Sequence, residues 1–161
     1  MKTLVEHHHL LARIETEMCP DKKDRRKMEL ILERLVEDVK MKKLGNARMF
    51  YVNSNKYPEK TGMSGIVPIQ TSHISFHYWS HPGRNVLSNA DSNCLLQFDL
   101  YTCGKLTKTE IKEVLHIFDV FVPTHANVTL INRKYGMKIE SNKTWNRGVC
   151  GWNKFVDRYR V

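Results

Sequence analysis

The spacing of the apolar residues constrains this chain to a sheet with only two helices in its first 132 residues. Period-2 alternation predicts strands at residues 4–14, 46–52, 64–70, 73–79, 95–102 and 126–132. Helical spacing predicts one helix over residues 21–43, and a capping pattern at Thr107 and Glu110 starts a second. Helices separated by runs of strands indicate an α+β fold, a two-layer α/β sandwich whose mainly antiparallel sheet carries the helices on one face.

The bulk composition fits one domain without a membrane anchor. The chain has 161 residues and no apolar run long enough for a transmembrane helix, and the N-terminus lacks the apolar core of a signal peptide. We therefore expect a cytoplasmic protein with no membrane partner. The four cysteines form no C-x-x-C pair, so we expect neither a zinc site nor a disulfide framework. His7, His8 and His9 lie in a predicted strand and point to alternating faces, which argues against a shared metal.

The last part of the chain has a different character. Residues 133–161 are rich in lysine and arginine, interleaved with aromatic side chains: Trp145, Trp152, Phe155 and Tyr159. We predict a main domain over residues 1–132 and a basic, aromatic extension over 133–161, packed on the domain or flexibly attached to it. With the net charge of +9, such a segment could bind single-stranded nucleic acid. We favour the simpler interpretation, a solvated segment with its aromatics packed on the body.

The residues that carry chemistry form an ordered series. Ser64 lies between glycines, the run Ser72-His73-Ile74-Ser75-Phe76-His77-Tyr78-Trp79 follows, and Thr102-Cys103-Gly104 ends a later strand. Each member alone is weak evidence, because a cysteine after a strand is usually a small buried hydrophobic residue. The ordered set resembles the active-site signature of the pyruvoyl-dependent S-adenosylmethionine decarboxylases in their small prokaryotic form. The resemblance covers most of residues 4–132.

The resemblance implies that the chain makes its own cofactor. The Ser72 hydroxyl would attack the carbonyl of Thr71, the backbone would break between them, and Ser72 would become a pyruvoyl group. Ser64 and His77 would handle protons during this self-cleavage. The pyruvoyl ketone would form a Schiff base with the substrate amine, and Cys103 would return a proton after carbon dioxide leaves. No metal is implied.

The resemblance also implies a substrate and a partner. Tyr57 and Trp79 would hold the adenine of S-adenosylmethionine between their rings, and the decarboxylated product would serve spermidine (polyamine) synthesis. His81 stands where the family has the glutamate that binds the ribose, and Thr71 stands where it has a glutamate before the processing serine. Family members work as homodimers of processed protomers, so we expect a homodimer here.

Two other functions remain open from the sequence. The changes at Thr71 and His81, with the positive charge, are compatible with an unprocessed, non-catalytic homologue that binds or regulates. Alternatively, the loss of the ribose-binding glutamate is compatible with a decarboxylase that has switched to an amino acid such as ornithine or arginine. The loop from residue 80 to 93 is longer than in the family and could reshape the pocket.

Overall fold

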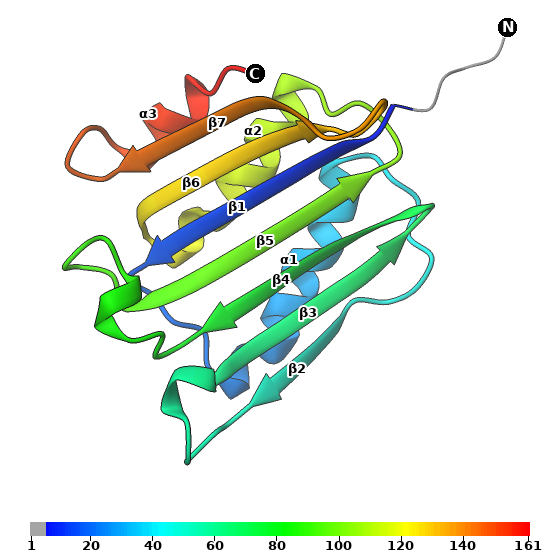
Figure 1. The fold of residues 1–161 in the computed structure, drawn as a ribbon. Coiled ribbons are helices and arrows are strands. Elements are labelled where there is room, and N and C mark those ends of the chain that lie inside the picture. The colour runs from blue at the N-terminus through cyan, green and yellow to red at the C-terminus, as the bar shows by residue number, and fades with distance from the viewer. Residues whose placement is uncertain (1–5) are drawn as a thin grey trace, which may run out of the picture.

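The computed structural model describes residues 6–161 and contains one seven-stranded antiparallel sheet in the order β2-β3-β4-β5-β1-β6-β7. All the helices lie on one face of it (Figure 1). The α+β sandwich is therefore confirmed. The strands are β1 (His8–Thr16), β2 (Arg48–Val52), β3 (Gly62–Ile69), β4 (Ser72–Trp79), β5 (Cys94–Thr102), β6 (Pro123–Asn132) and β7 (Lys138–Asn146), and the α-helices are α1 (Arg25–Asp38), α2 (Lys108–His116) and α3 (Trp152–Asp157).

The alternation of side chains along the strands separates a buried face from an open face. In β4, Ile74, Phe76 and Tyr78 are buried, whereas the residues between them are partly or fully exposed. Leu10 and Leu100 continue the buried face across β1 and β5. Because a strand's side chains alternate, the helices cover one side of the sheet, and the other side carries the polar side chains of the predicted site. The alternating orientation expected for the histidine run is confirmed, since His8 is buried and His9 is on the open face.

The two predicted helices form, but the first is shorter than predicted at both ends, because Lys22–Asp24 is a 3-10 turn and α1 begins only at Arg25. The helix α1 buries Met28, Leu32, Leu35 and Val36 against the sheet. It stops at Asp38 rather than at residue 43, and Lys40 just beyond has a left-handed backbone (φ 53°) that cannot continue a helix. In α2, both hydrogen bonds of the predicted capping box between Thr107 and Glu110 are present. Among residues 6–161, we find no helix that is long and apolar enough to cross a membrane.

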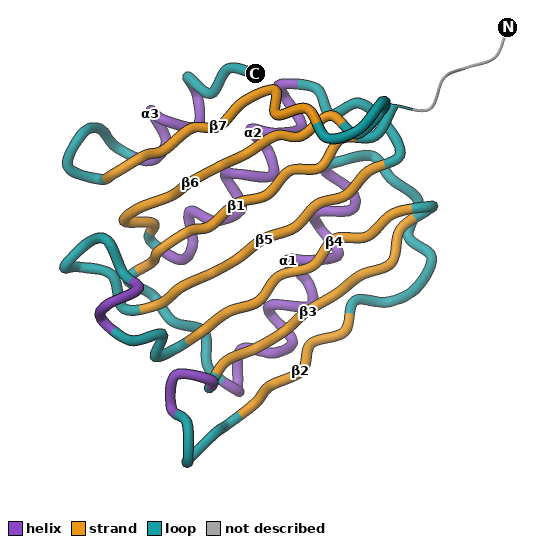
Figure 2. Tube along the Cα trace, in the orientation of Figure 1, coloured by secondary structure: helices purple, strands orange, loops and turns teal. Residues whose placement is uncertain are grey.

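Two elements in the last part of the chain were not predicted. The strand β7 pairs along β6, and α3 contacts α2 (Figure 2). The sequence pattern of β7 hid it, because only Ser141 and Trp145 are buried among nine residues. Trp145 and Trp152 pack edge to face with ring centres 5.0 Å apart, so neither ring is free to stack on a base. The domain boundary at residue 132 stays a prediction, and residues 4 and 5 of the first predicted strand lie outside the described residues.

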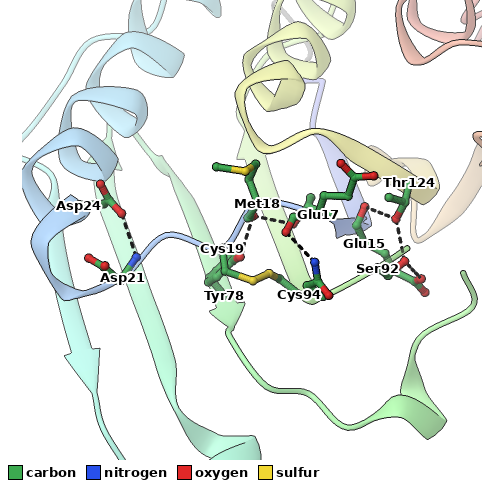
Figure 3. The surroundings of a disulfide bond; sticks show 12 residues. Glu15, Glu17, Met18, Cys19, Asp21, Asp24, Tyr78, Ser92, Cys94 and Thr124 are labelled. Atoms are coloured by element: carbon green, nitrogen blue, oxygen red, sulfur yellow. Dashed lines mark hydrogen bonds between the residues drawn. A yellow bond between two sulfur atoms is a disulfide. The ribbon is translucent and has the colours of Figure 1, made fainter. Parts of the chain in front are cut away.

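One expectation from the cysteines was wrong. Cys19 and Cys94 form a disulfide between the segment after β1 and the first residue of β5 (Figure 3). The two residues are 75 positions apart, so no local C-x-x-C signal could reveal the pair. The sheet pairing of β1 with β5 aligns Thr16 with Cys94 and so brings Cys19 within reach. Cys103 and Cys150 are free.

The disulfide predicts a redox-dependent stability. Closing a long loop restricts the unfolded chain, so Cys19→Ala should lower the free energy of unfolding by about 2–4 kcal/mol under oxidising conditions. Cys150→Ala, which removes a free thiol, is the matched control. Urea unfolding with and without reductant measures the difference. An equal midpoint for both variants in oxidising buffer would contradict the prediction.

Candidate active site

The predicted processing bond lies in a strained hairpin turn. Gln70 and Thr71 form the two-residue turn between β3 and β4, where Ile69 pairs with Ser72. Thr71 has a φ of 56°, in the left-handed region that β-branched residues rarely adopt. Such a conformation costs on the order of 1–3 kcal/mol. Among the described residues, Thr71 is thus one of three non-glycine residues with a left-handed backbone, and it supplies the carbonyl of the predicted scissile bond.

The hydroxyl of Ser72 has no hydrogen-bond partner. Its Oγ is buried, and among the described residues it is one of few buried side-chain polar atoms that make no hydrogen bond. A buried hydroxyl without a partner is costly and needs an explanation. In this structure the Ser72 hydroxyl therefore lies next to the Thr71 carbonyl with no hydrogen bond that ties it elsewhere.

The thiol of Cys103 lies at the same turn. Its Sγ is 3.6 Å from the carbonyl oxygen of Gln70. The antiparallel pairing of β4 with β5, in which His73 is opposite Tyr101, carries the end of β5 to the β3–β4 hairpin. The structure therefore brings together Thr71, Ser72 and Cys103, which are separated in the sequence by the loop and a strand.

Ser64 and His77 meet at the other end of β4. They are direct partners in the β3–β4 ladder, and the Ser64 Oγ is 2.9 Å from the His77 Nδ1. The Trp79 ring is 5.9 Å from the His77 ring. A shallow pocket of about 60 Å³ opens here, lined by Val52, Lys60, Gly62, Met63, Ser64, His77, Tyr78 and Trp79.

The remaining predicted recognition residues lie near this pocket. Tyr57 begins a 3-10 turn (Pro58–Lys60), and the Lys60 Nζ is 4.4 Å from the centre of its ring. The backbone of Ser80 bonds to Thr61, which holds this turn beside Trp79. His81 is exposed just beyond β4. Lys60 was missed by the sequence analysis, because a single lysine in a polar loop gives no pattern.

The two groups of predicted residues do not meet within one chain. Ser72 and His77 are five positions apart on a strand, which corresponds to about 16 Å at the usual strand rise. They also point to opposite faces, because five is an odd number of steps. The structure thus contains a processing end (Thr71, Ser72 and Cys103) and a recognition end (Ser64, His77, Trp79 and Tyr57) rather than one complete site.

The long loop beside the recognition end is held by a buried carboxylate. Glu15 accepts hydrogen bonds from the backbone nitrogens of Ser88 and Asn89. It also accepts one, at 2.9 Å, from the Ser92 hydroxyl (Figure 3). Arg13 pairs with the same carboxylate at 2.7 Å. Burial alone would raise the pKa of Glu15, but these hydrogen bonds outweigh it and lower the pKa. The loop is therefore an ordered part of the fold.

Comparison with known proteins agrees with the geometry. A family model described as S-adenosylmethionine decarboxylase matches residues 9–134, which include every predicted site residue. The chain belongs to the S-adenosylmethionine decarboxylase family. The match ends at residue 134, before the start of β7, so β7 and α3 lie outside the matched region.

Curated relatives carry the name S-adenosylmethionine decarboxylase proenzyme. The relative from Pyrococcus horikoshii is 33% identical over 97 residues, which are 60% of this chain and 59% of that protein. The one from Thermococcus onnurineus is 33% identical over 98 residues, 61% and 59% of the two chains. The one from Thermodesulfovibrio yellowstonii is 28% identical over 110 residues, 67% and 69%. The chain thus spans about three fifths of the length of the first two relatives.

The buried carboxylate of Glu15 predicts that its contribution to the free energy of unfolding depends on pH. A lowered folded-state pKa contributes stability that is complete above the ordinary glutamate value, about 4.3, and is lost as the pH falls through the folded-state pKa. Glu15→Gln should therefore cost about 1–3 kcal/mol at pH 7, and the difference from the parent protein should shrink below about pH 4. Glu113→Gln, at an exposed position, is the control. Urea melts across this pH range test the prediction, and a cost independent of pH would contradict it.

Proposed function

We propose that this protein is a pyruvoyl-dependent decarboxylase that cleaves itself between Thr71 and Ser72 and decarboxylates S-adenosylmethionine, supplying spermidine synthesis in the cytoplasm. The observation that carries the proposal is the hairpin: a strained Thr71, an unpartnered Ser72 hydroxyl and the Cys103 thiol occupy one turn. Membership of a family whose relatives are named proenzymes supports it. A cytoplasmic location would expose Cys19 and Cys94 to a reducing thiol pool.

The self-cleavage uses only the chain and water. The Ser72 Oγ attacks the Thr71 carbonyl, and the acyl group moves from the Ser72 nitrogen to its oxygen. Loss of the Cα proton then expels the Thr71 carboxylate and leaves dehydroalanine at position 72. Water replaces the nitrogen of the corresponding imine, ammonia leaves, and a pyruvoyl group remains. The elimination step breaks the connection between Thr71 and Ser72, so Thr71 would no longer be held in the left-handed conformation of the turn.

The residues present fit the proposed cofactor and its use. The ketone supplies an electron sink for decarboxylation. The Cys103 thiol, which contacts the Gln70 carbonyl in the turn, would hold and return the proton. At the recognition end, the hydrogen bond between Ser64 and His77 orients the imidazole, and Trp79 offers a ring for the adenine.

We also propose a homodimer, because one chain lacks a complete site. The hairpin turn of one protomer, which closes one end of the β3–β4 ladder, would meet the recognition end of its partner. The open face of the sheet, which carries His77 and Trp79, also exposes Phe50, Val52 and Ile66, and its apolar surface would be buried by such contact. Each dimer would then hold two sites related by the twofold axis.

The intact mass of denatured protein tests the self-cleavage. We expect two fragments, residues 1–71 and a larger one that begins with a pyruvoyl group. Ser72→Ala should give a single mass near 18.9 kDa, because it lacks the attacking oxygen, whereas Ser80→Ala, a control beside the same strand, should cleave normally. A single full-length mass for the parent protein would contradict the proposal and favour the unprocessed, non-catalytic homologue. A cleaved protein that acts only on ornithine or arginine would keep the chemistry and change the substrate.

Complementation tests the shared site. Coexpressed Ser72→Ala and His77→Ala chains form heterodimers that retain one intact site, so about a quarter of the sites should be active if the chains pair at random. Ser72→Ala with Cys103→Ala is the matched control, because both changes fall in the processing end and no combination restores a site. Carbon dioxide release from S-adenosylmethionine measures the result. Equal inactivity of both mixtures would argue against a shared site.

A further inference from the structure

On the open face of the sheet, near the processing end, one carboxylate lies between two imidazole rings. Asp99 of β5 has its Oδ1 2.9 Å from the His9 Nε2 and 3.2 Å from the His73 Nε2. His9 comes from β1 and His73 from β4, the two strands that flank β5. One carboxylate oxygen therefore joins three neighbouring strands. The sequence pattern predicted no function for Asp99 or His9, and His73 was only part of the serine-histidine motif.

The contacts around His9 define its hydrogen bonding. The Arg133 Nη1 is 3.5 Å from the His9 Nδ1, and an arginine only donates. The Nδ1 therefore accepts, and the Nε2 carries the hydrogen that is donated to Asp99. Arg133 is itself held over the Tyr101 ring, 4.9 Å from the ring centre. Partial burial would raise the pKa of Asp99, but the hydrogen bond from His9 outweighs it and lowers the pKa, which favours the ionised acceptor.

The position of His73 connects this cluster to the proposed chemistry. His73 directly follows Ser72, so the peptide nitrogen of His73 would carry the pyruvoyl group after cleavage. Cleavage would also cut the turn that holds the start of β4 and would create a new chain end there. Chain ends fray unless they are tied down. The contact between the His73 and Asp99 side chains would hold the new chain end one residue from the proposed pyruvoyl group.

We propose that Asp99 is a positioning residue that, held by His9, anchors His73 and so fixes the pyruvoyl-bearing chain end beside Cys103. This inference rests on the proposed function, because self-cleavage creates the chain end that needs the anchor. Cys103 lies four residues after Asp99, just beyond the end of β5 at Thr102, and its thiol contacts the carbonyl oxygen of Gln70 in the uncut turn. A displacement of about 1 Å at a reacting group can cost a hundredfold in rate, so loss of the anchor should act mainly on the chemical step.

The test combines intact mass with steady-state kinetics of the purified full-length chain. We expect Asp99→Asn and His73→Ala to cleave fully, because Thr71, Ser72 and the turn are unchanged. Their kcat for S-adenosylmethionine should fall about 10- to 100-fold, with KM within about threefold, since recognition lies at the other end of β4. His73→Gln should recover most of kcat, because its amide can donate to Asp99.

A surface pair provides the control. Asp119 is 3.3 Å from His116 at the end of α2, on the helical side of the sheet, and Asp119→Asn should match the parent protein. The inference is overturned if Asp99→Asn and His73→Ala behave like Asp119→Asn, or if His73→Gln is as slow as His73→Ala. It is also overturned if these variants fail to cleave while the parent protein does, which would place the cluster in processing. A parent protein that stays uncleaved overturns the proposed function and this inference together.

Discussion

The antiparallel ladder of β4 with β3 and β5 is the constraint on which the candidate site depends. Pairing of Ser64 with His77 at one end of β4, and of His73 with Tyr101 at the other, sets both groups of functional residues. A slip of one residue would turn His77 and Trp79 into the helical layer and expose Phe76 and Tyr78. Burial of those two aromatic side chains against α1 and η4 (Ile117–Phe121) therefore stabilises the register that places the chemistry.

The same strand explains why the site is divided. Side chains along β4 alternate between a covered and an open face, and the strand is long enough to separate its ends by more than the span of a small substrate. The strain and the free hydroxyl belong to the hairpin, whereas the hydrogen-bonded serine and histidine belong to the opposite end. The proposed shared site between two protomers would bring the two groups together without moving any strand. The anchor at Asp99 would then keep one half in place after the backbone is cut.

The loop from residue 80 to 93 and the C-terminal elements β7 and α3 lie away from the β3–β4 hairpin turn. The loop from residue 80 to 93 is tied to Glu15 and closed at its base by the Cys19–Cys94 disulfide. The strand β7 covers the outer edge of β6, and its basic side chains stay on the surface, while the tryptophans of the extension pack together. Trp145 and Trp152 are therefore buried, whereas Lys138 and Lys143 of β7 are exposed, although tryptophans and lysines alternate in the sequence.

The sequence by itself determined the fold class, the two main helices, most strands and the family, because apolar periodicity and an ordered motif are local properties. It did not reveal β7, where few side chains are buried, or the disulfide, whose cysteines meet only through the pairing of β1 with β5. The tertiary structure alone decided that Cys103 meets the hairpin, that Ser64 meets His77, and that Asp99 binds two histidines from different strands. Those contacts depend on strand register, which long-range packing sets and no local pattern encodes.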